Sequence, residues 1–350
     1  MRGFGIVGVM HTPLEILPVD PGDTDAWIAM RHAVERHDAP GEPLTNPALT
    51  RLGLLSRGEY HRFERLLARV GDEIVGDLGL ELALQDNQHL VEVHLRVHPE
   101  HRRRGVGTAL LAHAERRAAE LGRDTLVGYT SDHVEGGADF DRSGPPFALA
   151  RGYEVVDQDL HNRCDLDAVG EEVLTRRFEE AWTHAAGYEL VQSTASAVAD
   201  DLVEGIAYLC ERMYTDMPLG EALDLRPADV DAARIREYER SRAASGQSQV
   251  ISAVRHVATG VVVGYTFIRV DPGEERHAWQ DDTIVLPEHR GHRLGLILKI
   301  ANQRQLRRFR PQMRYVHTWN AEANGPMVDI NTAIGYWPLN RVLVVQKKLA

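Results

Sequence analysis

Hydrophobic positions along this 350-residue chain follow two periods, the alternation typical of strands and the three-to-four spacing typical of helices. Strand patterns are found at residues 14–19, 62–70, 73–85, 91–97, 125–130, 153–164, 187–192, 248–257, 261–270, 280–286, 315–319 and 341–348. Helical patterns are found at 22–36, 46–53, 105–121, 147–152, 165–186, 198–214, 228–244, 295–301 and 326–334. This mixture of strands and helices predicts an α/β (α+β) fold.

The segment from Gln280 to Lys299 carries the strongest indication of function. Its strand ends at Pro287, the basic loop HRGHRLG follows, and Leu294 and Leu298 then recur at helical spacing. Unpaired N–H groups and the positive end of the helix dipole make such a helix start an anion site. Glycine lets the backbone approach a bulky phosphate closely. We therefore predict that a phosphorylated ligand binds at this loop.

The same arrangement occurs earlier in the chain. Residues 91–111 read as a strand, a proline, the motif Arg102-x-x-Gly105-x-Gly107 and a helix. Gly295 minus Gly107 gives an offset of 188 residues, and Arg290 minus Arg102 gives the same. Strand, proline and glycine all align under that offset, which indicates two copies of one domain.

The repeat divides the chain into predicted domains at residues 1–166 and 187–350. Residues 167–186 join them, and Leu174, Phe178 and Trp182 recur there at helical spacing, so we expect a helical connector rather than a disordered linker. The hydrophobic content of 43% is ordinary for packed globular domains.

The loop motifs resemble those of a known superfamily. Arg102-x-x-Gly105-x-Gly107 is similar to the acetyl-CoA pyrophosphate loop of the GNAT (GCN5-related N-acetyltransferase) family, and Arg290-x-x-Arg293-x-Gly295 is a variant with Arg in place of the middle Gly. The segment HTWNAEANGPM, residues 317–327, is similar to the one that lines the pantetheine arm in tandem actinobacterial GNAT proteins. The chain thus resembles a tandem of GNAT domains in a mycothiol-synthase-like arrangement. The resemblance implies that each domain is a mixed, mostly antiparallel twisted sheet flanked by helices.

The resemblance also implies a cosubstrate, acetyl-CoA or another acyl-CoA, and no metal. In the C-terminal domain it would be held by Thr283, Val285, Arg290, Gly291, His292, Arg293, Leu294, Gly295, Asn320 and Asn324. In the N-terminal domain it would be held by Leu95, Val97, Arg102, Arg103, Arg104, Gly105, Val106 and Gly107. The role of Asn320 and Asn324 would be to bind the pantetheine amides, although turn chemistry explains the Asn-Gly pair equally well.

Acyl transfer to an amine needs a base that accepts the amine proton. Asp281 stands nine residues before Arg290, where some GNAT enzymes carry a carboxylate base. Strand alternation would place Asp281 on one face with Thr283 and Val285. The matching N-terminal residue is Val93, which favours chemistry in the C-terminal domain. A structural alternative is that Asp281 caps a turn or pairs with Arg276.

The expected general acid is missing. Many GNAT enzymes carry a Tyr four residues before a helix-ending Gly, but Asn331 and Ala148 occupy those positions here. A CoA thiol is already a fair leaving group, so we predict an acyltransferase that acts on a small-molecule amine by direct attack. The alternative is an acyl-CoA-binding module without turnover, for sensing or scaffolding.

Composition limits the compartment and the partners. The net charge of −12 disfavours nucleic-acid binding. Two cysteines provide no disulfide framework, and no apolar run reaches the ~20 residues of a membrane span. We therefore expect a cytoplasmic monomer or homodimer. Histidine pairs spaced by three, at 98 and 101 and at 289 and 292, have no further ligand pattern and cationic neighbours, which argues against a metal.

Overall fold

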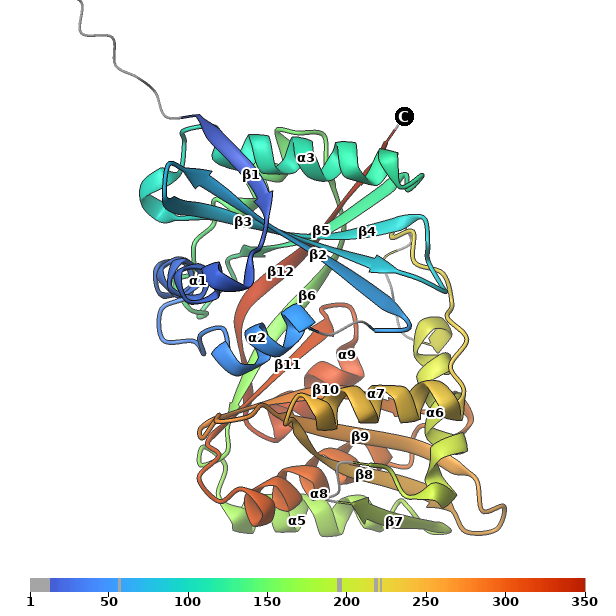
Figure 1. Cartoon of the computed structure of the whole chain (residues 1–350). Coiled ribbons are helices and arrows are strands. Elements are labelled where there is room, and N and C mark those ends of the chain that lie inside the picture. The colour runs from blue at the N-terminus through green and yellow to red at the C-terminus, as the bar shows by residue number, and fades with distance from the viewer. Residues whose placement is uncertain (1–12, 56–57, 194–196, 217–219, 221, 350) are drawn as a thin grey trace, which may run out of the picture.

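The computed structural model describes residues 13–55, 58–193, 197–216, 220 and 222–349. The strands form one 12-stranded sheet in the order β1-β2-β3-β4-β5-β12-β6-β11-β10-β9-β8-β7 (Figure 1). All strand pairs are antiparallel except β4–β5 and β10–β11. Both predicted sheets therefore exist, but they are joined into one.

The predicted helices and strands are found with boundaries shifted by a few residues. The N-terminal half contains β1 (Leu14–Pro18), α1 (Thr24–Asp38), α2 (Pro47–Leu55), β2 (His61–Val70), β3 (Glu73–Ala83), β4 (Leu90–Val97), α3 (Val106–Glu120), β5 (Thr125–Asp132), α4 (Gly144–Leu149) and β6 (Glu154–Asp165). After α5 (Glu171–Trp182), the C-terminal half contains β7 (Tyr188–Ser193), α6 (Asp200–Asp216), α7 (Ala232–Ala244), β8 (Ser248–His256), β9 (Val262–Val270), β10 (His277–Val285), α8 (Leu294–Phe309), β11 (Tyr315–Ala321), α9 (Gly325–Ala333) and β12 (Tyr336–Lys348).

Helix α7 starts at Ala232 rather than near Ala228, because the side chain of Asp231 caps it by accepting from the N–H of Arg234 at 2.8 Å. The loop predicted between α6 and α7 lies partly outside the described residues, at 217–219 and 221.

The last strand of each half lies beside the fifth strand of the other half. Strand β12 pairs with β5, for example at Val344 and Tyr129, and β6 pairs with β11, for example at Cys164 and Val316. The two exchanged strands also pair with each other in the middle of the sheet. The proposed domains 1–166 and 187–350 therefore share a sheet, and neither completes its sheet with its own strands alone.

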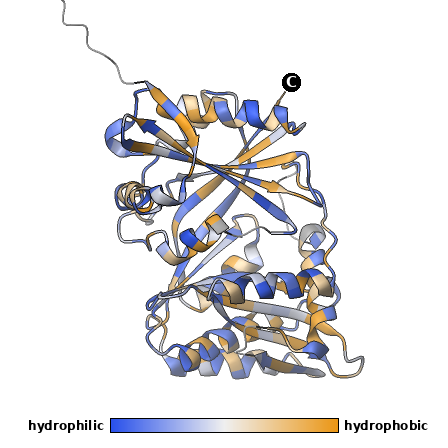
Figure 2. Ribbon diagram, in the orientation of Figure 1, coloured by the Kyte–Doolittle hydropathy of each residue, from blue (hydrophilic) through white to orange (hydrophobic). Residues whose placement is uncertain are grey.

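Each half has its own hydrophobic core beneath a central helix. Leu110, Ala114 and Ala118 of α3 pack against buried residues of β3 and β4, whereas Ile297 and Leu298 of α8 pack against β8, β9 and β10. Figure 2 shows hydrophobic segments concentrated in the strands, while the helices carry hydrophobic and hydrophilic positions in alternation. This is the amphipathic pattern from which the elements were predicted.

The parallel strand pairs separate along their length. Strands β4 and β5 pair only over 90–93 and 125–128, and strands β10 and β11 pair only over 277–279 and 315–317. Beyond these short pairings the strands diverge, so each half has an opening in the sheet directly before its basic loop. The helices α3 and α8 begin at those loops.

Candidate active site

The basic loops have matching backbones. At the first matched position Arg103 and Gly291 have φ values of 61° and 85°, and at the next Gly105 and Arg293 have values of 88° and 57°. A left-handed conformation costs a non-glycine residue roughly 1–2 kcal/mol, so Arg293 holds at some strain the shape that Gly105 adopts freely. The offset of 188 residues read from the sequence is thus confirmed in the fold.

The last glycine of each loop allows the following helix to pack closely. A Cβ atom on Gly107 would lie 3.1 Å from Cε2 of Phe147 in α4, and a Cβ atom on Gly295 would lie 3.0 Å from Cδ1 of Ile330 in α9. The first N–H groups of α3 and α8 have no intrahelical acceptor. Close backbone and unpaired donors make both loops suited to an anionic group.

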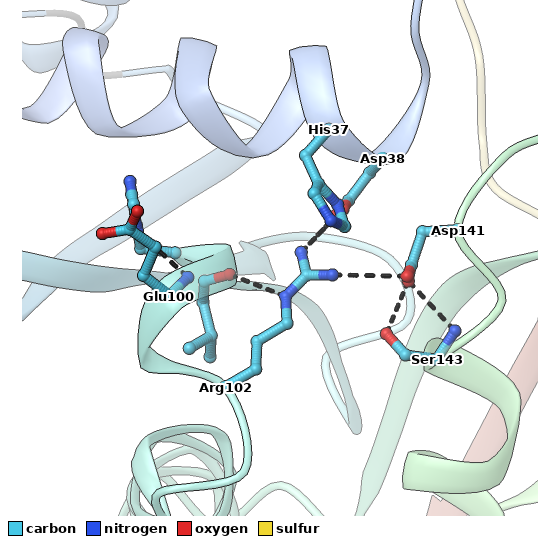
Figure 3. Close-up of polar contacts among 8 residues, drawn as sticks. His37, Asp38, Glu100, Arg102, Asp141 and Ser143 are labelled. Carbon is cyan, nitrogen blue, oxygen red and sulfur yellow. Dashed lines mark hydrogen bonds and ion pairs between the residues drawn. The ribbon is translucent and has the colours of Figure 1, made fainter.

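The arginines that open the loops have different surroundings. The guanidinium of Arg102 lies 2.7 Å from both carboxylate oxygens of Asp38 and 3.3 Å from Asp141, and its Nε donates to the carbonyl of Val97 (Figure 3). The Nε of Arg290 donates to the equivalent carbonyl, but within the described residues no carboxylate is paired with its guanidinium. Arg102 therefore has its charge balanced by protein, whereas Arg290 can meet an anion.

Strand β10 contains a bulge that corrects the predicted side-chain alternation. Gln280 pairs with Ile268 and Thr283 with Thr266, so Asp281 and Asp282 together oppose a single residue of β9. Asp281 contacts Arg269 and Asp282 contacts Tyr265, residues that share one face of β9. Thr283 instead bonds Thr266, at 2.7 Å. The prediction that Asp281 and Thr283 share a face is therefore wrong, because alternation does not hold across a bulge.

Asp281 lies at the point where β10 and β11 begin to separate. Burial raises the pKa of its carboxyl to about 6, although Arg269, whose Nε lies 3.2 Å from Oδ2, opposes the shift. The partner of Asp281 is thus Arg269 and not the predicted alternative, Arg276. A carboxylate with this pKa is a base that works near neutral pH.

The neighbouring Asp282 belongs to a second, more enclosed group. Its Oδ2 accepts from the hydroxyl of Tyr265 at 2.6 Å, and that hydroxyl lies 3.0 Å from Sγ of Cys210. Burial raises the pKa of Asp282. The three side chains line a largely apolar cavity of about 290 Å³ beneath α6 and α7.

The N-terminal half carries a different set of charged side chains on its matching strand, β4, and on the neighbouring strands β2 and β3. His94 lies 3.1 Å from Glu92, and Glu81 lies 2.9 Å from His61. Hydrogen bonds to Glu81 and Glu92 raise the pKa of His94 to about 9. Burial would raise the pKa of Glu81, but hydrogen bonds from His61 and His94 lower it to about 2. Neither group is a base near neutral pH.

A large cleft of about 1170 Å³ lies between the halves on the face of the sheet that carries Trp279 and Arg269. Trp319 of β11 also lines it, is 44% exposed and stacks on His161 with ring centroids 4.4 Å apart. The sequence alone did not identify Trp279 and Trp319 as site residues. The position of Trp319 in the segment HTWN, beside a predicted ligand site, could have indicated it.

The asparagines of the predicted pantetheine segment are bonded within the protein. Asn331 accepts from Nζ of the buried Lys299 at 2.7 Å and donates to Oδ1 of Asn320 at 3.0 Å. Burial lowers the pKa of Lys299 to about 7. The side chain of Asn324 caps α9 by accepting from the N–H of Met327. The turn role of Asn324 is thus present in the structure, and Asn320 faces the α9 side of the sheet.

The remaining predicted contacts have structural partners too. The predicted strand residues Leu95, Val97 and Val285 are partly buried and pack against the cores of their halves. His292 contacts the carbonyl of His184 through Nδ1 at 3.0 Å.

Comparisons with known proteins agree with this architecture. Residues 29–135 match the family model described as Acetyltransferase (GNAT) family. A tandem GNAT protein from the clavulanic acid biosynthesis pathway is similar over 96% of this chain and 98% of its own, with 29% identity and a TM-score of 0.78. A GCN5-related N-acetyltransferase from Sphaerobacter thermophilus is similar in fold over 96% and 95%, with 15% identity and a TM-score of 0.65. No curated protein matches the sequence.

These findings define the class of protein. Residues 29–135 match the GNAT acetyltransferase family, and the whole chain has the fold of a tandem GNAT protein. It is an N-acetyltransferase of the GNAT type, a class that transfers acyl groups from acyl-CoA. Among the described residues no helix is long and apolar enough to cross a membrane.

Proposed function

We propose that the protein transfers an acetyl or similar acyl group to a primary amine of a small molecule, at the opening between β10 and β11. The observation that carries the proposal is the position of Asp281, with its pKa of about 6, at the bulge where these strands separate. Asp281 shares its face of the sheet with Trp279 and Arg269 beside the large cleft.

The two faces of the opening would have separate tasks. Thr283, Asn320 and the loop that ends at Gly295 lie toward α8 and α9, and they would hold the pantetheine arm and the pyrophosphate. Acyl-CoA would supply an activated thioester. Arg290 would meet a phosphate charge, while the first N–H groups of α8 would donate to the pyrophosphate.

The opposite face would receive the amine. A primary amine is protonated near neutral pH, since its pKa is ~10, and it must lose that proton before it attacks. Asp281 would accept the proton, directly or through water. The indoles of Trp279 and Trp319 offer flat surfaces that favour a cationic or ring-shaped acceptor. The negative net charge of the chain, −12, favours a cationic acceptor.

We infer that the N-terminal half binds acyl-CoA without turnover. Its loop matches the family motif more closely, but His94 and Glu81 have pKa values of about 9 and 2. Residues of the C-terminal half also lie against the corresponding face of the N-terminal half. The side chain of Asn87 exchanges hydrogen bonds of 2.8 and 3.0 Å with the backbone of Arg226. Arg234 is paired with Asp86 nearby.

The alternative function is an acyl-CoA-binding module without turnover in either half. It is favoured by Asn331 and Ala148, which stand where a tyrosine acid is usual in the family and are both buried. In this function CoA would still bind the loop that ends at Gly295, but no amine would be acylated.

Turnover across a panel of small amines, measured as thiol release from acetyl-CoA, separates these functions. Gly295→Glu places a negative charge against the pyrophosphate and a side chain against Ile330, so we expect the C-terminal site to lose CoA and activity together. The matched variant Gly107→Glu should remove one equivalent of CoA and leave the chemistry in place. If Gly295→Glu binds CoA with unchanged affinity, the assignment of the loop is wrong. If every amine fails while CoA still binds, the alternative function is correct.

A further inference from the structure

Three side chains from distant parts of the sequence meet at the base of the large cleft. Glu42 follows α1, His161 lies on β6 and His317 on β11. Nε2 of His161 is 3.1 Å from Nδ1 of His317, and that nitrogen is 3.5 Å from Oε2 of Glu42. The three atoms all lie within 4.8 Å of one another, and both imidazoles are buried.

These separations fit a single metal ion. Zinc binds imidazole nitrogen and carboxylate oxygen at ~2.0–2.2 Å, so two ligand atoms of a tetrahedral site lie roughly 3.3–3.6 Å apart. The observed separations of 3.1 and 3.5 Å lie close to these values. Two imidazoles and one carboxylate are a ligand set that zinc takes when a fourth position stays open.

Each of the two histidines is also oriented by a partner at its other ring nitrogen. Nδ1 of His161 lies 2.9 Å from Oδ1 of Asn340, whose Nδ2 donates to the carbonyl of Arg341 at 3.2 Å. That donation fixes the amide, so His161 carries its proton on Nδ1 and turns a lone pair on Nε2 toward His317. Nε2 of His317 lies 2.8 Å from His277. Ligating histidines are typically held in this way through their second nitrogen.

We propose that Glu42, His161 and His317 bind one zinc ion whose fourth position opens into the cleft. Glu42, His161 and His317 themselves line this cleft, together with Trp279 and Trp319, so water or a heteroatom of a bound molecule has access to the ion. The proposal does not depend on which half carries out acyl transfer.

The proposed ion reverses the sequence expectation of no metal. That expectation rested on the absence of a further ligand pattern beside the histidines spaced by three. Two of those histidines are engaged elsewhere, since His101 contacts Glu73 and His289 contacts the hydroxyl of Tyr188. Sequence separation conceals the group that the sheet brings together. Arg163 contacts the other oxygen of Glu42 at 2.6 Å and weakens the attraction for a cation, so we expect a site that chelators empty readily.

The test uses the full-length protein, stripped with a chelator and titrated with Zn²⁺ against a chromophoric competitor. We expect one equivalent to bind. Glu42→Gln and His161→Gln should each weaken binding at least as much as the loss of an orienting partner does, by on the order of 10–100-fold. With Co²⁺ in place of zinc, the wild type should show the strong visible absorption of a tetrahedral ion, and both variants should lose it.

The control is His94→Gln, which removes a histidine from the group formed by Glu81, Glu92 and His94. This variant should bind zinc as the wild type does. Circular dichroism establishes whether each variant is folded. If His161→Gln does not fold, the zinc affinity of Glu42→Gln alone tests the site. The proposal is overturned if the wild type binds no zinc, if folded Glu42→Gln binds it with unchanged affinity, or if His94→Gln is the variant that loses it.

Discussion

Replacing Asp281 by Asn should lower activity and raise stability at the same time. The loss of a positioned base typically reduces the rate by on the order of 10²–10⁴-fold. The burial that raises the pKa of Asp281 to about 6 also makes its ionised form unfavourable in the folded protein. If Asp281 serves chemistry, its replacement should therefore raise the stability of the protein. If it served stability, its replacement would lower it.

The size of the stability gain follows from the pKa. An ordinary Asp has a pKa of ~3.9, so the shift of about two units corresponds to ~3 kcal/mol. The side chain is 31% exposed and paired with Arg269, which reduces the expected gain to ~1–2 kcal/mol. Because the pKa of Asp281 is higher in the folded protein, the loss of stability caused by its ionisation is absent below pH 4. That loss grows between pH 4 and 6 and is complete above pH 6. Asp281→Asn should thus raise the free energy of unfolding at pH 8 and leave it unchanged at pH 4.

The rate should change its dependence on pH as well. Below pH 6 the wild-type rate requires the ionised form of Asp281, so the logarithm of the rate rises with a slope of one. Between pH 6 and the amine pKa of ~10, ionised Asp281 accepts the proton of the bound ammonium group, and the rate is nearly independent of pH. In Asp281→Asn the amine must lose its proton to solvent first, so the slope should be one throughout.

The assay is thiol release from acetyl-CoA at pH 5 to 9, with Glu92→Gln of the N-terminal half as the matched control. We expect that control to keep nearly full turnover, because Glu92 is paired with His94. If Asp281→Asn kept the full rate across this range while Glu92→Gln was inactive, the roles of the halves would be the reverse of those proposed.

Further predictions concern the cleft, the core and the shared sheet. Trp319→Ala should raise KM for the amine about tenfold, the size of one lost cation–π contact, with little change in CoA affinity. Steady-state kinetics and calorimetry would report both, and an unchanged KM would remove Trp319 from the acceptor site. The pKa of Lys299 is lowered to about 7, so wild-type stability should rise between pH 7 and 10, and Lys299→Met should abolish that rise in thermal melts. Residues 1–186 and 187–350 expressed separately should be insoluble and recover on co-expression, whereas a soluble monomeric half would contradict this.

Local features of the fold were accessible from the sequence. The repeat at 188 residues predicted both basic loops, because the close packing of α3 on α4 and of α8 on α9 favours glycine at 107 and 295, and a preferred residue type is visible in the sequence. The helices and strands could be located from the sequence because burial of one face leaves a periodic pattern of hydrophobic residues.

Features that depend on partners distant in the chain were not accessible. Asp281 and Asp282 form a bulge only because β9 offers one residue opposite them, so alternation along β10 alone predicted the wrong neighbour for Asp281. The meeting of His161 and His317 depends on β6 lying beside β11, and no local pattern distinguishes an exchanged strand from one that returns to its own sheet.

The exchange of strands ties the folding of the first half to the end of synthesis. Strand β5 ends at Asp132 and its partner β12 begins at Tyr336, a separation of 204 positions. At ~5–20 residues per second, the ribosome takes roughly 10–40 s to supply the missing strand. During that time the edge of β5 is unpaired and open to other chains. The yield of this protein in a cell should therefore depend on chaperones that cover an N-terminal edge until the last strand emerges.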